Sequence, residues 1–466
     1  MLEQKNSNEI IRENYKSYIQ YITKSRNYPS IIDGCKPAHR RCIEQIYKEC
    51  PKHFVKSATA IGAIVKAHPH PSSIYGTLIP LTQNDAPFPI FDGQGNFGSR
   101  IPYSEASAER YTEIKISDLS SKIFESFNDY VDTVEGDLNN IEPQNLATFL
   151  PLCLLNGTYS IPTGMSTVDI PSLNALDLCD YAIDVLKHKD TSYKSEVFIR
   201  PNLGAVQIKS SKKDWQNLLN SGVGKISISP KIKHISDRSI EIIALPETKT
   251  IEHVNKILQT ELDKDQIDVR DETTDRLSII IEIRPYKKIN IDTITKKLTE
   301  KLTITKSYRF IYSDNDGNVI FCGVPNNMKN CIDYLIKCCN KWVKFNIIDL
   351  STKLRVLEVI EEMKKDGFIN ELSKYNKTTA VQQLMKKYKI TEEQSLSVLS
   401  KPMSYLTKEH LNDIKSLKQE IKNYKIIDKD VYTFLITKYE EIKELIGSKF
   451  KDSTTTFARQ GKKSLV

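Results

Sequence analysis

The spacing of apolar residues divides the chain into three stretches with different periodicities. At the N-terminal end, apolar residues three or four positions apart predict a helix over residues 8–24. Pro37 suits the first turn of a second helix that ends near Cys50, and residues 55–67 predict a third. Two short helices joined by a proline-containing link are typical of a helix-turn-helix, in which the second helix enters a DNA groove.

Between about residues 130 and 340 the pattern changes to short β-rich runs. These are VFIRP (197–201), AVQIK (205–209), KISISP (225–230), IEIIALP (240–246), LSIIIEI (277–283), RFIYS (309–313) and NVIFCG (318–323). A helical stretch at 251–262 lies among them, so an α+β domain is expected. Asp314–Gly317 predicts a hairpin turn rather than a calcium loop, because the first and twelfth ligand positions would fall on Tyr312 and Gly323.

After about residue 346 the pattern is helical and highly charged. A set of apolar residues three or four positions apart predicts a coiled-coil seam: Leu411, Ile414, Leu417, Ile421 and Tyr424. Thr391 and Gln394 have the spacing of a capping box ahead of a short helix. The polar and basic composition of residues 448–466 predicts a flexible tail.

Composition places the chain among ordinary core-forming proteins. It is 39% hydrophobic and 27% charged, and no apolar run approaches the roughly 20 residues that span a bilayer. The N-terminus lacks the apolar core of a signal peptide, and the nine cysteines form no C-x-x-C pair. We therefore expect reduced thiols in the cytoplasm, with the adjacent Cys338 and Cys339 packed in a core.

Positive charge is concentrated near the N-terminal end. The net charge is only +8, but residues 33–66 hold seven Lys or Arg and three acidic residues, with four histidines in or just after this segment. Clusters of this kind commonly neutralise phosphates. His68-Pro69-His70 could also ligate a metal, but no Cys or carboxylate partner stands at ligand spacing.

The most informative motif follows this basic segment. A glycine-rich turn, DGQGNFGS (92–99), precedes the pair Arg110-Tyr111. A phenol can act as a covalent nucleophile where cations stabilise the phenolate and the developing phosphoryl charge. The glycines also fit G-x-G-x-x-G, which would suggest a nucleotide-dependent dehydrogenase, but the flanking prolines indicate loops instead of a strand-turn-helix unit.

DGQGNFGS followed by RYTE closely resembles the breakage-reunion subunit of type IIA DNA topoisomerases, in which this tyrosine attacks the DNA backbone. Four more segments resemble the same family: 25–41 (SRNYPSIIDGCKPAHRR), 56–78, 139–171 and 240–283. The resemblance covers about residues 20–283 by motif and extends to about 447 by pattern. Residues 68–73 depart from it, since the family usually has His-Pro-His-Gly-Asp-Ser where this chain has His-Pro-His-Pro-Ser-Ser. That departure puts sensitivity to quinolones in doubt.

The resemblance assigns roles to individual residues. Tyr111 would be the nucleophile that forms a 5′-phosphotyrosyl link, and Arg110 its neighbouring transition-state cation. Arg26, Lys36 and Arg40 align with basic residues that hold phosphates, and His39 and Arg41 extend this surface. His70, in the His-Pro-His turn, would help to orient the active site. Ile170 would wedge between base pairs of the bound DNA.

The resemblance also implies an α+β multidomain fold. It comprises an N-terminal helical arm (1–24), a winged-helix DNA-binding domain with the tyrosine (25–129), an α/β tower domain (130–345) and a helical coiled-coil gate that dimerises (346–447), followed by the basic tail (448–466). We expect no DNA-wrapping domain after the helical region, and in this the chain most resembles the medium subunit of T-even bacteriophage topoisomerase.

We found no carboxylate cluster for divalent cations and no ATP-site motif in the sequence. Mg²⁺ and ATP are therefore expected on a separate ATPase and metal-binding (B-type) subunit, and the implied assembly is a homodimer of this chain with that partner on double-stranded DNA. It would act in the cytoplasm of a bacterium or phage-infected cell. Two alternatives stay open: a shortened gyrase A or topoisomerase IV A subunit, and an architectural DNA-binding protein that does not cleave.

Overall fold

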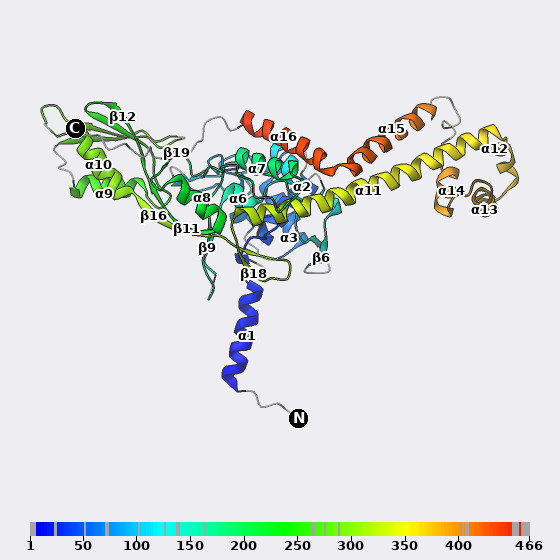
Figure 1. The fold of residues 1–466 in the computed structure, drawn as a ribbon, viewed down its shortest axis with the longest axis horizontal. Coiled ribbons are helices and arrows are strands. Elements are labelled where there is room, and N and C mark those ends of the chain that lie inside the picture. Colours follow the sequence, from blue (N-terminus) through cyan, green and yellow to red (C-terminus); the bar gives the residue numbers. More distant parts are fainter. Residues whose placement is uncertain are drawn as a thin grey trace. The chain divides into compact units, whose positions relative to one another are not determined.

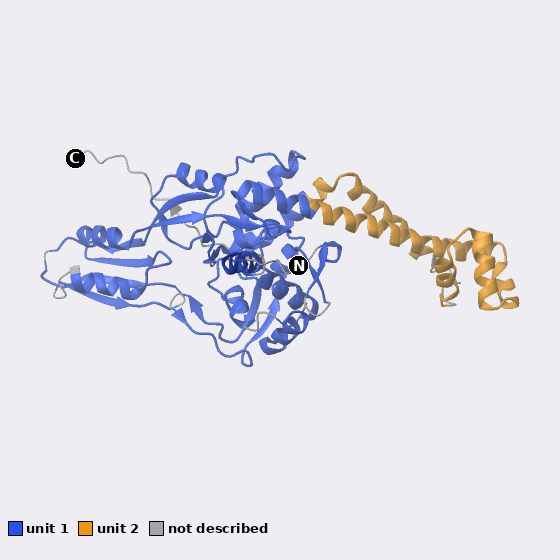
Figure 2. Cartoon of the chain, turned by 90° about the horizontal axis from the view of Figure 1, so that it is seen from below, with its two compact units in different colours: residues 1–335, 436–466 blue, residues 336–435 orange. Residues whose placement is uncertain are grey.

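The structure is a computed structural model. It describes residues 6–22, 26–50, 53–69, 74–100, 103–124, 127–136, 140–162, 164–261, 266–274, 276–287, 289–402, 405, 410–449 and 456–457. The chain forms two compact units, residues 1–335 with 436–466 and residues 336–435 (Figure 2). Each unit is described by itself.

The N-terminal part of unit 1 contains the predicted helices as α1 (Ser7–Ile22), α2 (Pro37–Glu49) and α3 (Ser57–Ala67), followed by α4 (Tyr75–Thr82), and α1 projects away from the others (Figure 1). Pro37 opens α2, where a missing N–H costs nothing. A three-stranded antiparallel sheet of order β1 (Val55–Lys56), β5 (Glu113–Ile116), β2 (Phe91–Gln94) accompanies α2 and α3.

Several short elements connect this part to the rest of unit 1. They are β3 (Ser99–Arg100), β4 (Tyr103–Ser104), α5 (Asp118–Phe124), β6 (Thr133–Glu135), β7 (Ile141–Pro143) and α6 (Leu152–Asn156). The pairs β3–β4 and β6–β7 are antiparallel hairpins. The β6–β7 hairpin carries an acidic residue, Glu142, that reaches a basic residue of α2.

A six-stranded sheet forms the centre of unit 1. Its order is β19 (Thr456–Phe457), β10 (Gln207–Ile208), β11 (Val223–Ser229), β16 (Ile304–Arg309), β9 (Val168–Ile170), β8 (Thr158–Ser160). All neighbours are antiparallel except β19 and β10. The helices α7 (Ala175–Lys187) and α8 (Lys212–Ser221) lie between these strands in the sequence. The strand β19 lies within the segment predicted to be a flexible tail.

A second sheet, of order β12 (Lys231–Ser236), β13 (Ser239–Ala244), β15 (Ile279–Ile283), β14 (Ile267–Asp271), packs against two helices. These are α9 (Ile251–Glu261) and α10 (Ile291–Leu302). Their apolar faces join in one core that includes Ile240, Ile281, Val254 and Leu298. The predicted β run at 240–246 and helix at 251–262 are confirmed within the described residues.

Two local predictions have different outcomes. β17 (Ile311–Ser313) and β18 (Val319–Phe321) form an antiparallel hairpin, and the Asp314 carboxylate accepts hydrogen bonds from the backbone of the turn, as expected. The run VFIRP at 197–201 is not a strand, and its one ladder contact is an isolated bridge from Pro201 to Leu173. The apolar pattern here reflects burial without strand pairing. The Ile199 side chain is buried, and its carbonyl accepts a hydrogen bond from the indole of Trp215 at 2.8 Å.

Unit 2 is helical. It is built from most of α11 (Val324–Lys365) and from α12 (Phe368–Glu371), α13 (Lys377–Tyr388), α14 (Glu392–Leu399) and α15 (His410–Lys429), and ends within α16 (Val431–Lys449). The Thr391–Gln394 capping box is present in α14. The helices α11 and α15 run side by side and antiparallel, with the rings of Trp342 and Tyr424 5.1 Å apart (Figure 2).

The predicted seam of α15 packs on α11 inside unit 2. Ile414 is buried in a core with Val356 and Ile360, and Ile421 is also buried, whereas Leu411 is 44% exposed. All nine cysteines are free, and Cys338 and Cys339 are fully buried in α11, as predicted. Among the described helices, none is both long and apolar enough to cross a membrane.

Candidate active site

Tyr111 lies at the surface, two residues before the central strand of the small sheet. Its side chain is 65% exposed, and its backbone N–H donates to the carbonyl of Ala108 at 2.9 Å. The guanidinium carbon of Arg110 stands 4.7 Å from the centre of the Tyr111 ring. The structure therefore presents a phenol to solvent with a cation against its face.

The glycine-rich turn explains how the chain reaches this position. Gly95 has a φ of +95°, and a Cβ built on it would lie 2.9 Å from the carbonyl oxygen of Tyr111. β2 pairs with β5 up to Gln94 opposite Glu113, so the turn begins directly beside the tyrosine. No helix follows the turn, because the next elements are the hairpin strands β3 and β4. The turn therefore lacks the following helix that a dinucleotide-binding dehydrogenase would need.

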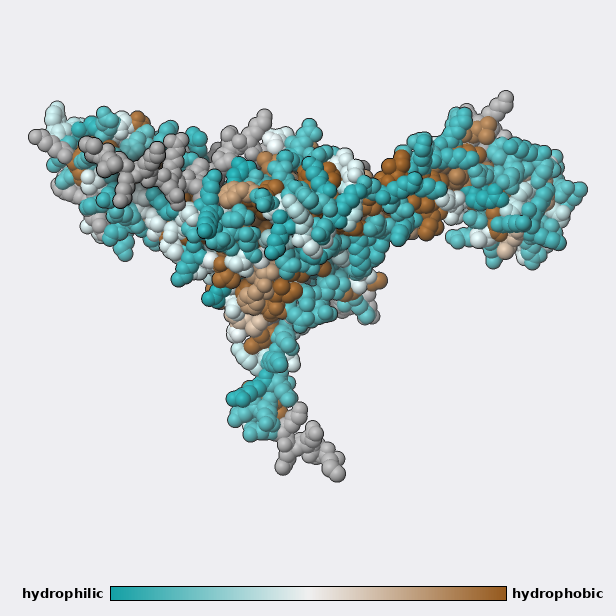
Figure 3. Space-filling model, viewed as in Figure 1, coloured by the Kyte–Doolittle hydropathy of each residue, from teal (hydrophilic) through white to brown (hydrophobic). Residues whose placement is uncertain are grey.

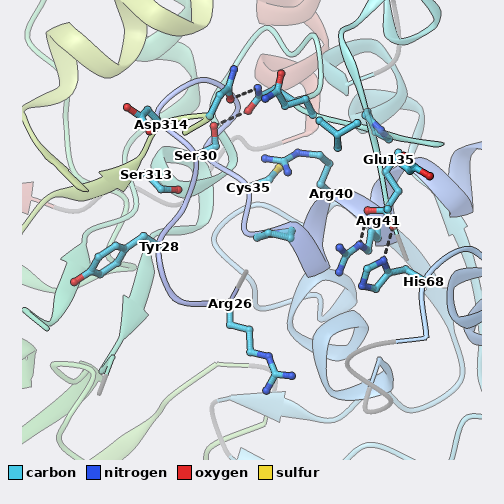
Figure 4. Close-up of a pocket in the computed structure, with 18 of the residues that line it drawn as sticks. Arg26, Tyr28, Ser30, Cys35, Arg40, Arg41, His68, Glu135, Ser313 and Asp314 are labelled. Carbon is cyan, nitrogen blue, oxygen red and sulfur yellow. Dashed lines mark hydrogen bonds and ion pairs between the residues drawn. The ribbon is translucent and has the colours of Figure 1, made fainter. Parts of the chain in front are cut away.

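A separate pocket of about 480 Å³ gathers part of the predicted basic surface (Figure 4). Arg26, Arg40 and Arg41 line it together with His68. Tyr111 and Arg110 are absent from its described lining residues. Arg26 is exposed, whereas the two consecutive arginines of α2 are mostly covered by protein.

Arg40 is held by a buried carboxylate. Its Nε donates to one oxygen of Asp33 at 2.7 Å, and a terminal nitrogen donates to the other at 3.1 Å. Asp33 is fully buried and also accepts from the backbone N–H groups of Cys35 and Leu146. These bonds fix the guanidinium at the pocket wall before any ligand arrives.

Arg41 is held by a second carboxylate, which it shares with a histidine. The Nε of Arg41 donates to Glu142 at 2.8 Å, while the other oxygen of Glu142 lies 2.5 Å from Nδ1 of His68. Glu142 comes from the β6–β7 hairpin, and His68 caps the C-terminal end of α3. The sequence pattern missed this glutamate, since nothing in its spacing from α2 or α3 pointed to the contact.

Burial lowers the pKa of both Lys36 and His39. Lys36 donates to the carbonyl of Tyr159 at 3.4 Å, and burial lowers its pKa. Burial, with the nearby charges of Lys36 and Arg40, lowers the pKa of His39 to about 3. His39 is therefore neutral at physiological pH in the free chain, and it offers a hydrogen-bonding ring instead of a charge.

The two remaining sequence-predicted contacts have different outcomes. His70 lies outside the described residues. Ile170, in β9, is only 2% exposed, so in this conformation its side chain cannot reach a base step. Ile161, at the turn of the same β8–β9 hairpin, is 70% exposed. Figure 3 shows apolar surface near the base of α1, where Figure 1 labels β9 and β18.

Among the described residues, no group of three His, Cys, Asp or Glu side chains lies close enough together to hold a metal ion. The carboxylate nearest in sequence to Tyr111 on β5, Glu113, is paired with Lys56 at 2.7 Å. The chain's described residues around Tyr111 thus do not by themselves fit a metal-binding site.

Comparison with known proteins identifies the relatives of this arrangement. The family model for the A subunit of DNA gyrase/topoisomerase IV matches residues 26–446, which include the basic pocket and Tyr111. The chain belongs to this family.

Individual relatives agree. The chain is 24% identical to the DNA gyrase A subunit of Brachyspira hyodysenteriae, over 85% of this chain and 50% of the relative. It is 26% identical to the DNA topoisomerase 4 A subunit of Haemophilus influenzae, over 88% and 57%, and 27% identical to that of Staphylococcus aureus, over 95% and 58%. The chain thus spans about half the length of the curated relatives it matches.

Proposed function

We propose that this chain is the DNA-cleavage and religation subunit of an ATP-dependent type IIA topoisomerase, acting on double-stranded DNA. The observation that carries the proposal is an exposed Tyr111 with Arg110 stacked on its ring, in a chain that matches the gyrase/topoisomerase IV A family from residue 26 to 446. A phenol in this setting can reach a phosphodiester without rearrangement of the core.

The proposed reaction is a reversible exchange of phosphodiester bonds. The Tyr111 oxygen forms a bond to phosphorus and loses its proton, and the bond from phosphorus to the 3′ oxygen breaks as that oxygen gains one. The product is a 5′-phosphotyrosyl link and a free 3′ hydroxyl, and religation reverses each step. Arg110 would stabilise the added negative charge on the phosphoryl oxygens in the transition state.

The basic pocket supplies the proposed contact with the DNA backbone. Arg26 is exposed, and the carboxylates of Asp33 and Glu142 fix Arg40 and Arg41 at the wall, where a phosphate would meet guanidinium groups already in place. Lys36 and His39, which flank the two arginines in sequence, would add hydrogen bonds to DNA.

The elements around this pocket suggest how the DNA duplex is read. The helices α2 and α3 with the β1–β5–β2 sheet have the composition of a winged helix. We propose α3 as its groove-reading helix, because it is the second helix of the pair.

We propose Ile161 in place of Ile170 as the residue that wedges between base pairs. A wedge must be apolar, exposed and carried on a projecting element. Ile161 meets these requirements at the turn of the β8–β9 hairpin, whereas Ile170 is buried at its base.

The remaining roles concern partners and assembly. We propose that a B-type subunit supplies the ATPase and the Mg²⁺ site, and that two copies of this chain associate through the helical gate of residues 346–447. The tower would correspond to residues 130–345, with the two sheets and the helices α9 and α10.

Two kinds of enzyme within the family fit this proposal: the split-subunit enzyme of T-even bacteriophages and a shortened bacterial gyrase or topoisomerase IV chain. Either would act on DNA in the cytoplasm of a bacterial or phage-infected cell.

The proposal is tested by trapping the covalent intermediate. Tyr111→Phe should leave DNA binding near normal and abolish the protein–DNA adduct that detergent traps in the presence of Mg²⁺ and a B-type subunit, because only the hydroxyl is lost. Tyr103→Phe is the matched control, since Tyr103 is 80% exposed on β4 and has no proposed role. An adduct that survives in Tyr111→Phe would identify another nucleophile, and a parent chain that never forms one would favour the architectural DNA-binding alternative.

A further inference from the structure

Three hydroxyl groups lie in a chain beneath the segment that carries Tyr111. They belong to Tyr75, at the start of α4, to Thr112, and to Ser57, at the start of α3. The hydroxyl oxygens of Tyr75 and Thr112 are 3.0 Å apart, and those of Thr112 and Ser57 are 2.8 Å apart. Thr112 and Ser57 are fully buried, so water does not compete for these bonds.

The same groups fasten both ends of the segment 107–112. The Tyr75 hydroxyl donates to the carbonyl of Ser107 at 2.7 Å, and the Ser57 N–H donates to the carbonyl of Thr112 at 2.9 Å. A third bond runs from the N–H of Ala58 to the carbonyl of Glu109 at 3.3 Å. Tyr111 thus stands on a short arc whose two ends are tied to the first turns of α3 and α4.

The glycine-rich turn closes the arc from its other side. The N–H of Ser107 donates to the carbonyl of Asn96 at 2.8 Å, and the ring of Phe97, which is 5% exposed, lies 6.4 Å from the ring of Tyr75. Tyr111 itself makes few contacts that would fix it, because its side chain is mostly in solvent. Its position is therefore set by the arc beneath it.

We propose that Tyr75 and Thr112 are positioning residues for Tyr111, which hold its backbone so that the phenol meets a phosphodiester in line. The inference rests on the proposed function and adds to it two residues that do not touch the reacting atoms. A displacement of the nucleophile by about 1 Å can slow an enzymatic step by about a hundredfold. The lost hydroxyls should therefore affect the cleavage step and leave DNA binding unchanged.

The test compares variants that differ by single atoms. Thr112→Val keeps the shape of threonine without its hydroxyl, Thr112→Ser keeps the hydroxyl, and Tyr75→Phe removes only the phenolic oxygen. Each is assembled with the B-type subunit, Mg²⁺ and a short duplex at saturating concentration. The single-turnover rate of adduct formation is measured beside the dissociation constant for the same duplex and the thermal midpoint of unfolding.

We expect Tyr75→Phe and Thr112→Val to slow adduct formation by about tenfold or more with unchanged DNA affinity, and Thr112→Ser to cleave like the parent. Parental rates in both hydroxyl-less variants would overturn the inference. So would a loss that appears equally in affinity, or one that Thr112→Ser shares, because either would indicate general damage to the fold. A different result would contradict the proposed function and not the positioning role: the parent chain forms no adduct although it and Tyr75→Phe bind DNA equally well.

Discussion

The two consecutive arginines of α2 each have their own carboxylate, taken from a different part of the chain. Asp33 holds Arg40 from the loop before the helix, and Glu142 holds Arg41 from a hairpin about a hundred positions away in sequence. A buried guanidinium without such a partner would be costly, so the pairs allow cations to stand ready at a partly closed pocket. Their negative charges also limit how strongly the pocket attracts phosphate.

Glu142 gives a prediction at this scale. Glu142→Gln keeps a hydrogen-bond acceptor for Arg41 but removes one negative charge from the pocket. We expect DNA binding that depends more steeply on salt, by about one additional counterion, and an unfolding free energy lower by about 2 kcal/mol from the weakened bonds to Arg41 and His68. Salt titrations of duplex binding and denaturant unfolding measure the two effects.

The control for Glu142→Gln is Glu135→Gln. Glu135 lines the same pocket but is exposed. Glu135→Gln removes the same charge but breaks no buried hydrogen bond. The variant should therefore alter the salt dependence of DNA binding and leave the unfolding free energy unchanged. Equal stability losses in both variants would show that the contacts of Glu142 have no special structural role.

Part of the candidate site could be predicted from residues alone. Tyr111, Arg110 and the glycine-rich turn follow one another closely, and the structure keeps them together because Gly95 packs under the tyrosine carbonyl. The environment of the basic residues could not be predicted. The lowered pKa values of Lys36 and His39 come first from burial, and the pairing of Arg41 depends on Glu142.

At the scale of elements, helices with a periodic apolar face or a capping motif were the most predictable. Their apolar faces repeat within one segment, so α2, α3, α9 and α14 could be placed by spacing and capping. Strands depend on partners elsewhere in the sequence. The edge strand β12 has mainly exposed side chains and gave no apolar signal, whereas residues 197–201 gave an apolar signal because they pack without pairing.

The β8–β9 hairpin shows the same limit, and it carries a prediction. Sequence resemblance assigned the wedge to Ile170, but Ile170 is only 2% exposed, whereas Ile161 in the same hairpin is 70% exposed. Ile161→Ala should reduce the bend of a bound duplex without lowering stability, since affinity comes mainly from phosphate contacts. Ile170→Ala should lower the unfolding free energy by about 2–5 kcal/mol through a buried cavity.

Energy transfer between dyes at the two ends of a short duplex reports the bend, and thermal or denaturant unfolding reports stability. The two variants serve as controls for each other, because they remove the same atoms from opposite environments. A bend that is unchanged in Ile161→Ala would remove this residue from the proposed interface.

At the scale of the whole molecule, the division into units could not be predicted from local pattern. The sequence suggested one continuous helical gate over residues 346–447, but the contacts place the C-terminal part of α16 in unit 1. There the Tyr439 hydroxyl donates to the carbonyl of Phe149 at 2.7 Å, and Lys443 pairs with Asp180. The spacing of apolar residues cannot reveal contacts between residues almost three hundred positions apart. The predicted domain limits stay predictions.

The last prediction concerns what this chain does alone and with a partner. Purified by itself, it should bind duplex DNA with an affinity that falls steeply as salt rises, because the arginines of the basic pocket would displace counterions from phosphates. It should leave supercoiled plasmid unchanged, since we expect the Mg²⁺ site and the ATPase on a B-type subunit. Adding that subunit with Mg²⁺ and ATP should give ATP-dependent relaxation and decatenation, which Tyr111→Phe should abolish and Tyr103→Phe should not. Plasmid topology gels separate these outcomes. Relaxation by the isolated chain would contradict the division of labour between subunits, and relaxation by the Tyr111→Phe complex would contradict the assignment of the nucleophile.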